Sequence, residues 1–252
     1  MKHMFGDRAT IPENLVRDID RRLRVYGNSR HGNPTDPVDD LVYIILSMQT
    51  EEYSYRATFE SLRIRHGGWE WLLSSPIDAI AAEIRDTGLQ HKKAKYLQNA
   101  TAKIVSDFGE LSLRRLQDLT DAAVLKYLTS LPGISTKSAR CIMLYTLGRQ
   151  VFPVDTHVWR VSRRLGLTPT VPKPNEKRQE ELEAKIPPDV RYSLHVNMVS
   201  HGRETCSTYW PNCESCILAE LCPAKGTPDE TWGQWRKPQG AWINYRKEKR
   251  SV

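Results

Sequence analysis

The chain has 252 residues, of which 39% are apolar and 27% are charged, so it can form one large or two modest globular domains and is neither disordered nor fibrous. A formal net charge of +7 favours a polyanionic partner, although a basic balance is also typical of an ordinary solvated surface. The longest apolar run, Leu41 to Met48, is too short to span a membrane, and residues 1–10 lack the apolar core of a signal peptide. We therefore expect a soluble cytoplasmic protein with no membrane partner, associated with the nucleoid if the source is prokaryotic.

Helix-start signals and helically spaced apolar residues recur along the chain, whereas strand alternation does not appear. Asp36 before Pro37 is typical of an N-cap followed by a first-turn proline, Ser75 before Pro76 repeats the pair, and Thr120 opens another helix. Besides these three helices, we expect helices at 13–25, 51–66, 91–108, 136–147, 156–165, 176–185 and 190–201. The sequence therefore predicts an all-α protein.

The C-terminal tail, residues 224–252, is rich in Gly, Pro, Trp and basic residues. Trp232, Trp235 and Trp242 are interleaved with its positive charges. Such a tail can contact nucleic acid by charge and stacking, or its aromatic side chains can anchor it to the body of the protein. We favour anchoring.

Two of the predicted helices are joined by the short turn LPGIS, residues 131–135. Gly133 allows close backbone approach, and the N–H groups at the start of the following helix could hold a phosphate without recognising base sequence. An ordinary helix-helix corner is the commoner meaning of such a local pattern.

Lys137 follows this turn, and Asp155 lies in the segment PVDTH. A lysine amine can attack a sugar carbon and hold it as an imine, while a nearby carboxylate stabilises the cationic sugar that forms. We expect the helix N-terminus and partial burial to lower the pKa of Lys137. Each residue also has an ordinary alternative, because most lysines are solvated and Asp155 is a good N-cap for the next helix.

Four of the five cysteines, Cys206, Cys213, Cys216 and Cys222, have six, two and five residues between them. This tight spacing predicts metal ligation in a reducing compartment rather than a disulfide framework. Zinc is the default metal for four thiolates when ligand type alone is considered. We expect the fifth cysteine, Cys141, to be a buried core residue.

The segments LSMQT, GLQHKKA, LPGISTK and PVDTH, followed by the four cysteines, together resemble the endonuclease III family of helix-hairpin-helix DNA glycosylases. The resemblance covers most of the chain. It implies two helical domains that flank a DNA-binding cleft, in which the target nucleotide is flipped out of a damaged or mismatched duplex. The implied domains are a six-helix barrel over 38–150, with the helix-hairpin-helix at about 121–147, and a cluster domain built from 1–37 and 151–223.

The resemblance also implies roles for individual residues. Lys137 matches the family's nucleophile, and Asp155 matches its catalytic aspartate. Gln49 and Leu89 match positions that fill the gap left by the flipped nucleotide, although Gln49 could also be an ordinary polar residue at a helix end and Leu89 a core leucine. The remaining predicted DNA contacts are His91, Lys93, Gly133, Ser135 and His157. Lys92 and Lys95 belong to the same basic run as His91 and Lys93, which could contact phosphates, although such a run is usually a solvated helix face. The cysteine spacing resembles the family's [4Fe–4S] loop, so the implied cofactor is that cluster rather than zinc.

The implied function is a base-excision repair glycosylase with AP lyase activity, which removes oxidised pyrimidines through a Lys137 imine and cuts the strand by β-elimination. The alternatives are a glycosylase for mismatched thymine or uracil or for methylcytosine, and a non-catalytic DNA-binding protein. We expect a monomer. Ser135 replaces a second glycine of the family pattern, and Thr129 stands where well-known members carry a carboxylate near the damaged base. The resemblance therefore specifies the reaction type more closely than the damaged base.

Overall fold

The computed structural model describes residues 11–168 and 175–225. Within these residues the chain forms eleven α-helices and four short 3₁₀ helices and contains no strand, which confirms the predicted all-α class. None of the described helices has the length and apolar character needed to cross a membrane. The predicted tail lies almost entirely in residues 226–252, outside the described part of the chain.

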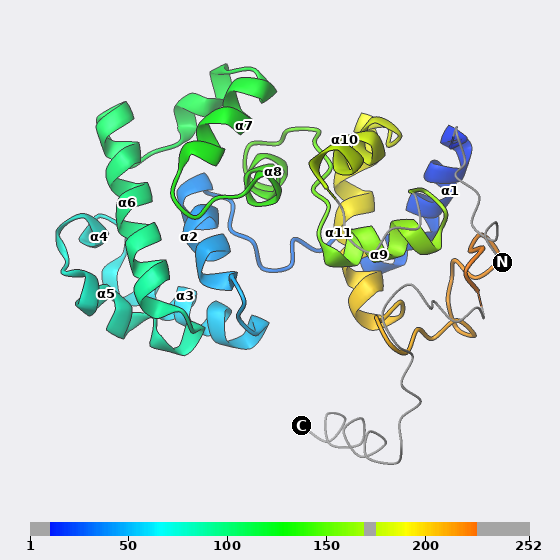
Figure 1. Ribbon diagram of the computed structural model, residues 1–252, viewed down its shortest axis with the longest axis horizontal. Coiled ribbons are helices and arrows are strands. Elements are labelled where there is room, and N and C mark those ends of the chain that lie inside the picture. The colour runs from blue at the N-terminus through cyan, green and yellow to red at the C-terminus, as the bar shows by residue number, and fades with distance from the viewer. Residues whose placement is uncertain (1–10, 169–174, 226–252) are drawn as a thin grey trace, which may run out of the picture.

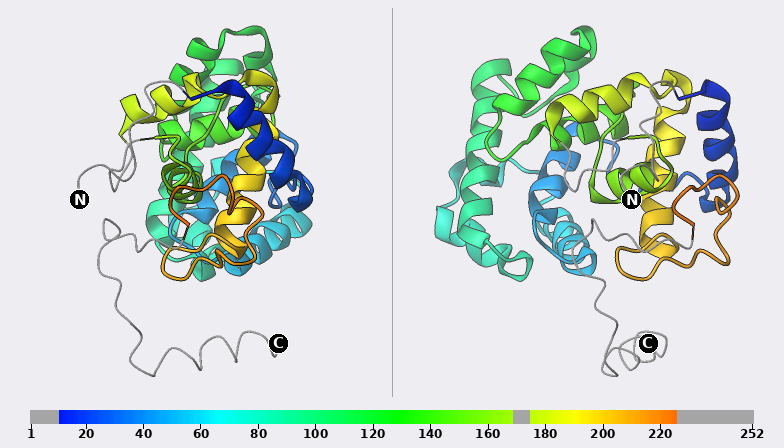
Figure 2. Two further views of the ribbon diagram at one scale, coloured as in Figure 1. Left: turned by 90° about the vertical axis from the view of Figure 1, so that its right-hand side faces the viewer. Right: turned by 45° about the vertical axis from the view of Figure 1, so that its right-hand side comes forward.

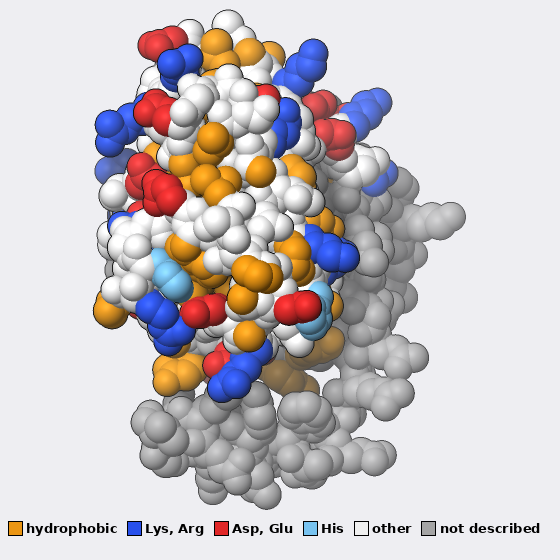
Figure 3. Space-filling view, turned by 90° about the vertical axis from the view of Figure 1, so that its left-hand side faces the viewer, with side chains coloured by type: hydrophobic (Ala, Val, Ile, Leu, Met, Phe, Trp, Pro, Cys, Tyr) orange, Lys and Arg blue, Asp and Glu red, His pale blue; other side chains and the backbone are white. Residues whose placement is uncertain are grey.

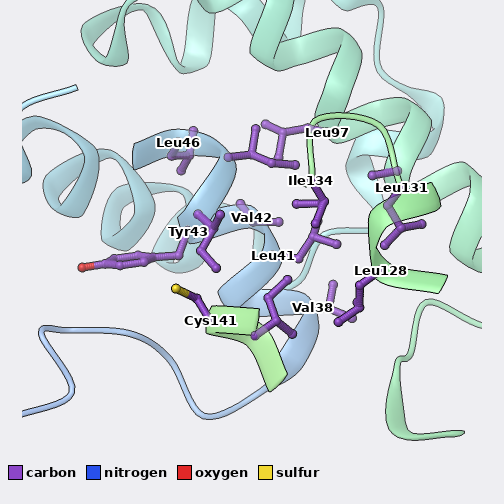
Figure 4. Packing of buried hydrophobic residues seen from close by; sticks show 14 of the residues in the cluster. Val38, Leu41, Val42, Tyr43, Leu46, Leu97, Leu128, Leu131, Ile134 and Cys141 are labelled. Atoms are coloured by element: carbon purple, nitrogen blue, oxygen red, sulfur yellow. The ribbon is translucent and has the colours of Figure 1, made fainter. Parts of the chain in front are cut away.

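Residues 37–145 form the hairpin lobe, the left-hand body in Figure 1. It contains α2 (Pro37–Ser47), α3 (Glu52–His66), α4 (Trp71–Ser74), α5 (Ile77–Glu83), α6 (Gln90–Phe108), α7 (Asp121–Ser130) and α8 (Thr136–Tyr145). Nearly every residue of α2 is buried, because this apolar helix lies inside the lobe and other helices surround it. Figure 4 shows Val38 and Leu41 of α2 packing toward Leu128 and Ile134 of the α7–α8 hairpin.

The cysteine lobe is the right-hand body in Figure 1. It contains α1 (Glu13–Leu23), α9 (Thr156–Arg164), α10 (Glu176–Ala184), α11 (Arg191–Glu204) and the cysteine loop, residues 206–222. Its separate hydrophobic core includes Ile19, Trp159 and Met198. Although they are far apart in sequence, α1 and α11 lie side by side, with the cysteine loop next to both (Figure 2). A hydrogen bond that Ser193 Oγ donates to Asp20 Oδ1, at 2.5 Å, joins these two helices.

The predicted N-caps at Asp36 and Thr120 are confirmed. Asp36 accepts hydrogen bonds from the Val38 and Asp39 amides, and Thr120 accepts one from the Ala123 amide. The predicted cap at Ser75 is wrong, because this residue instead ends α4, a one-turn helix that sequence analysis did not predict. The Ser75 amide donates to Trp71 O and its carbonyl accepts from Gln98 Nε2, so packing against α6 places it outside the next helix.

The outer face of the hairpin lobe, opposite the cysteine lobe, carries a mixed surface. Figure 3 shows Lys and Arg side chains interspersed there with Asp, Glu and apolar ones. The ion pairs of this lobe include Arg65 Nη1 to Glu83 Oε2, at 2.5 Å. Interspersed charges of both signs produce no strong field of one sign over this face.

Candidate active site and cysteine loop

A hollow with a volume of about 610 Å³ lies where the two lobes meet. From the hairpin lobe it is lined by α2, the start of α3 and α8, and from the cysteine lobe by residues 154–157 and by α11. Lys137 and Asp155 both line this cleft, one from each lobe. The structure thus brings together the two residues predicted to carry the chemistry.

Lys137 reaches the cleft because of the local geometry of the hairpin. Ser135 is the N-cap of α8 and accepts a hydrogen bond from the Ser138 amide at 3.2 Å, which places Lys137 in the first helical turn. Residues four apart share a helix face, so Cys141 and Tyr145 line the cleft beside Lys137. This face of α8 therefore forms one wall of the candidate active site.

The hairpin turn requires glycine at position 133. Gly133 has φ +86°, a left-handed conformation that other residues rarely adopt, and a Cβ there would lie 2.7 Å from the Tyr96 ring. The turn thus lies directly against α6, while Ser135 is exposed. Ser135 acts as a side-chain cap, so the residue that replaces a second glycine of the family pattern stabilises the start of α8.

The predicted lowering of the Lys137 pKa is wrong. The negative charge of a Cys141 thiolate and the Asp155 carboxylate raise this pKa, and together they outweigh burial, which lowers it. Lys137 in turn lowers the pKa of Cys141, but burial outweighs this effect and raises that pKa to about 11. The resting site therefore holds a protonated lysine beside a carboxylate.

Asp155 is the predicted N-cap of α9, and its carboxylate also lines the cleft. Its Oδ1 accepts the Val158 amide at 2.8 Å. Burial would raise the pKa of Asp155, but the Lys137 ammonium, His195 and His157 lower it, and the net shift is downward. Asp155 is therefore an ionised carboxylate at neutral pH.

Two cleft residues that sequence analysis missed, Tyr145 and His195, form a neutral pair across the lobe boundary. Tyr145 Oη lies 3.1 Å from His195 Nε2, and His195 Nδ1 lies 2.8 Å from Pro153 O. Burial lowers the pKa of His195 to about 4, so the ring is uncharged at neutral pH. The spacing of Tyr145, eight residues after Lys137, was the available signal, whereas nothing in the sequence near His195 indicates the cleft. The predicted contact His157 also lines the cleft, where Arg160 Nη2 lies 3.0 Å from its Nδ1.

Asp40 is a further residue that sequence analysis missed. It precedes the cleft-lining residues Tyr43, Ile44 and Ser47 by three, four and seven positions, so it lies on the same face of α2. Its side chain is fully buried, and neither carboxylate oxygen has a hydrogen-bond partner. Burial raises the pKa of Asp40 to about 8, against the opposing effects of Arg30 and Lys137. A neutral acid therefore lies behind the cleft wall near neutral pH.

The two predicted gap-filling residues have an unusual backbone conformation. Gln49 and Leu89 both have φ 51°, in the left-handed region, and both are exposed, Leu89 by 45%. The alternative role of Leu89 as a core leucine is therefore excluded. His91 is exposed nearby, with its Nδ1 3.5 Å from Asp78 Oδ1. Their DNA contacts stay predictions, but all three side chains are accessible.

The predicted DNA contact of Lys93 is wrong. Its side chain is fully buried, and its Nζ donates to Leu46 O at 2.8 Å, Thr50 Oγ1 at 2.6 Å and Thr87 O at 2.7 Å. The basic run after Leu89 does not form one solvated face, because this lysine points into the lobe while Lys92 and Lys95 are exposed. An ammonium with three protein acceptors has no donor left for a phosphate.

The cysteine loop encloses a second, small cavity of about 40 Å³. All four predicted ligands line it: Cys206, Cys213, Cys216 and Cys222. Arg164 Nη1 lies 3.1 Å from Cys206 Sγ, and His201 Nε2 lies 3.7 Å from Cys216 Sγ. Among the described residues no group of three or more His, Cys, Asp or Glu is arranged to hold a single metal ion. Four thiols around one cavity, with a guanidinium donor beside one sulfur, fit the thiolate ligation of an iron-sulfur cluster.

Several curated proteins are similar in sequence. The chain is 30% identical to the DNA glycosylase/AP lyase ROS1 of Arabidopsis thaliana over 170 residues, which cover 61% of this chain and 12% of that protein. It is 32% identical to a putative DNA glycosylase of the same plant over 180 residues, which cover 71% of this chain and 59% of that protein. It is 31% identical to endonuclease III of Sulfolobus acidocaldarius over 149 residues, covering 58% and 62%. The chain thus spans less than two thirds of each of these relatives.

Solved structures share the fold. A trapped endonuclease III–DNA covalent intermediate superposes with a TM-score of 0.71 and 24% identity, over 84% of this chain and 96% of that one. A thermostable thymine-DNA glycosylase superposes with a TM-score of 0.69 and 20% identity, over 83% of this chain and 95% of that one. These likenesses confirm the helical architecture expected from the endonuclease III resemblance.

The family model described as HhH-GPD superfamily base excision DNA repair protein matches residues 42–188, more than half of the chain. The match runs from α2 through the hairpin, Lys137 and Asp155 to the end of α10. The chain therefore belongs to the HhH-GPD superfamily of base excision DNA repair proteins, in which its endonuclease III resemblance is confirmed.

Proposed function

We propose that the protein is a bifunctional DNA glycosylase and AP lyase that acts on duplex DNA as a monomer, with Lys137 as its nucleophile. The observation that carries the proposal is that Lys137 and Asp155, from different lobes, line one cleft and influence each other's ionisation. A non-catalytic DNA-binding module has no need for this arrangement of a half-buried lysine and a carboxylate in one cleft. The relatives described as DNA glycosylase/AP lyase and endonuclease III support the same reaction class.

The proposed reaction begins with a proton transfer. Because the resting Lys137 is an ammonium, it must release a proton before it can attack, and we assign the Asp155 carboxylate as the acceptor. The free amine attacks C1′ of the flipped nucleotide, the glycosidic bond breaks, and the base leaves with the bond electrons and takes up a proton. Sugar ring opening gives an iminium, which acidifies the C2′ proton. Loss of that proton expels the 3′ phosphate and cuts the strand.

For the substrate, we propose oxidised or ring-saturated pyrimidines, with mismatched thymine or uracil and methylcytosine as the second candidates. The superposition with a thymine-DNA glycosylase keeps the mismatch alternative open, since the two chains share a fold. A glycosylase panel on defined duplexes distinguishes these candidates. It should contain thymine glycol, dihydrouracil, uracil, mismatched thymine, methylcytosine and an abasic site, and release of only mismatched bases or methylcytosine would refute the oxidised-pyrimidine proposal.

For the cofactor, we propose a [4Fe–4S] cluster held by Cys206, Cys213, Cys216 and Cys222, which line one cavity. The cluster would tie the cysteine loop to α9 and α11, because residues of both helices line the same cavity. Metal and acid-labile sulfide analysis of the purified protein, together with its visible absorption spectrum, tests this. A colourless protein that contains zinc and no iron would overturn the assignment.

Borohydride trapping tests the nucleophile. The wild-type protein should give a covalent adduct with a duplex that contains an abasic site, because hydride reduces the lysine imine to a stable amine. Lys137→Ala should give no adduct, whereas Lys177→Ala, which changes an exposed lysine on α10, should trap as the wild type does. An unchanged yield in Lys137→Ala would rule out Lys137 as the nucleophile.

A further inference from the structure

The buried ammonium of Lys93 joins two loops that are far apart in sequence. Its acceptors are Leu46 O near the end of α2, Thr50 Oγ1 and Thr87 O. Thr50 directly follows Gln49, and Thr87 lies two residues before Leu89. The same charge is therefore bonded to both segments that carry the proposed gap-filling residues.

Thr50 strengthens this junction. Its Oγ1 also donates to Thr87 O, so the two loops are bonded directly as well as through Lys93. Thr87 Oγ1 in turn donates to Ile84 O at 2.7 Å, which holds the second loop against the end of α5. The junction is thus a small network in which one ammonium and two hydroxyl groups fix three backbone carbonyls.

The two loops need such a restraint because their exposed residues are strained. Gln49 and Leu89 both have φ 51°, and a residue other than glycine loses roughly 1 kcal/mol or more in this conformation. Both side chains are exposed, Leu89 by 45%. The backbone beside each residue is bonded to the Lys93 network, which can supply the restraint.

Burying the Lys93 ammonium costs free energy because the charge loses its hydration. A buried ammonium therefore needs protein acceptors that offset this cost. Burial lowers the pKa of Lys93 to about 8, so the charged form is still the main one at neutral pH. Three acceptors at 2.6–2.8 Å satisfy its donors, and the end of a helix favours a cation. A methionine of similar length would fill the same space without binding either loop.

We propose that Lys93 is a positioning residue that holds Gln49 and Leu89 in left-handed conformations at a fixed separation, so that both can enter the gap left by an extruded nucleotide. The proposal rests on the proposed glycosylase and lyase function, and it assigns Lys93 no contact with DNA. It predicts that loss of the Lys93 ammonium slows strand cleavage in duplex DNA but not in single-stranded DNA. A single strand has no opposite base and no stacked gap to fill.

Lys93→Met tests the proposal, with Lys103→Met on the same helix as the matched control. Strand cleavage at an abasic site is measured in a duplex and in a single-stranded oligonucleotide of the same sequence. We expect the duplex rate of Lys93→Met to fall by about tenfold or more and its single-strand rate to stay within about twofold of wild type. Lys103→Met should leave both rates unchanged, because Lys103 pairs with Asp107 away from the two loops.

If Lys93→Met loses the same fraction of its cleavage rate on both substrates, or loses none on either, the proposal is overturned. If Lys93→Met does not fold, the same comparison with Thr50→Val decides, since this change removes the hydroxyl that links Lys93 to Thr87 and should give a smaller duplex-specific loss. Thr50→Val with unchanged duplex cleavage would then refute the positioning role. Failure of the proposed function is a separate result, since the wild-type protein would then cut neither substrate.

Discussion

Replacing Asp40 with asparagine should stabilise the protein in a pH-dependent way. The carboxyl group is fully buried, and no hydrogen-bond partner satisfies either oxygen, so ionisation of this group is unfavourable in the folded state. Burial therefore raises the pKa of Asp40 from 3.8 to about 8. The Asp40→Asn substitution would keep the shape of the side chain and remove the ionisation.

The size and sign of the effect follow from proton linkage. Between pH 3.8 and about 8 the folded protein retains a proton on Asp40 that the unfolded chain has lost, so the wild type loses stability as the pH rises through this interval. At roughly 1.4 kcal/mol per pH unit, the interval from 3.8 to 7 gives at most about 4 kcal/mol. Below pH 3.8 both states hold the proton, and Asp40→Asn should change the free energy of unfolding little.

Urea denaturation of both proteins at about pH 4, 7 and 8.5 measures this difference. The gain in free energy of unfolding for Asp40→Asn should be small at the lowest pH and increase toward the highest. Asp118→Asn, which replaces an exposed carboxylate, is the control and should shift stability by less than about 0.5 kcal/mol throughout. A difference that is the same at every pH, or a loss of stability that grows with pH, would refute the reasoning.

Three further predictions concern the cleft, the hairpin and the cysteine loop. Asp155→Asn keeps a cap for the Val158 amide but removes the charge. Abasic-site cleavage should therefore slow by about 100-fold with little change in Tm. A lower Tm with an unchanged cleavage rate would contradict the catalytic assignment of Asp155. Gly133→Ala should lower the free energy of unfolding by about 1–3 kcal/mol, because the new Cβ meets the Tyr96 ring and φ is positive; equal urea midpoints would be inconsistent with this geometry. Oxidative removal of the proposed cluster should lower Tm, since its four ligands line the cavity that joins the loop to the lobe, and an unchanged melting curve would exclude this structural role.

The sequence by itself determined the local structure. Capping residues and apolar spacing depend on neighbours within a few positions, so the helix starts at Asp36, Thr120 and Asp155 could be predicted and are confirmed. The one-turn helix α4 was not predicted, because Trp71–Ser74 is too short to show helical periodicity. The order of Lys137, Asp155 and the four cysteines also indicated the family before any contact was known.

Only the tertiary structure decided how these residues are partnered. Lys93 binds Leu46 O, 47 positions away, so its sequence neighbours suggested a solvated basic run where the fold places a buried junction. Asp40 and His195 acquire their ionisation states from burial, and the pKa of Lys137 depends on Cys141 of its own helix and on Asp155 of the other lobe. The physical reason is that burial and electrostatic coupling depend on which helices pack together, and local sequence patterns carry no information about residues that are distant along the chain.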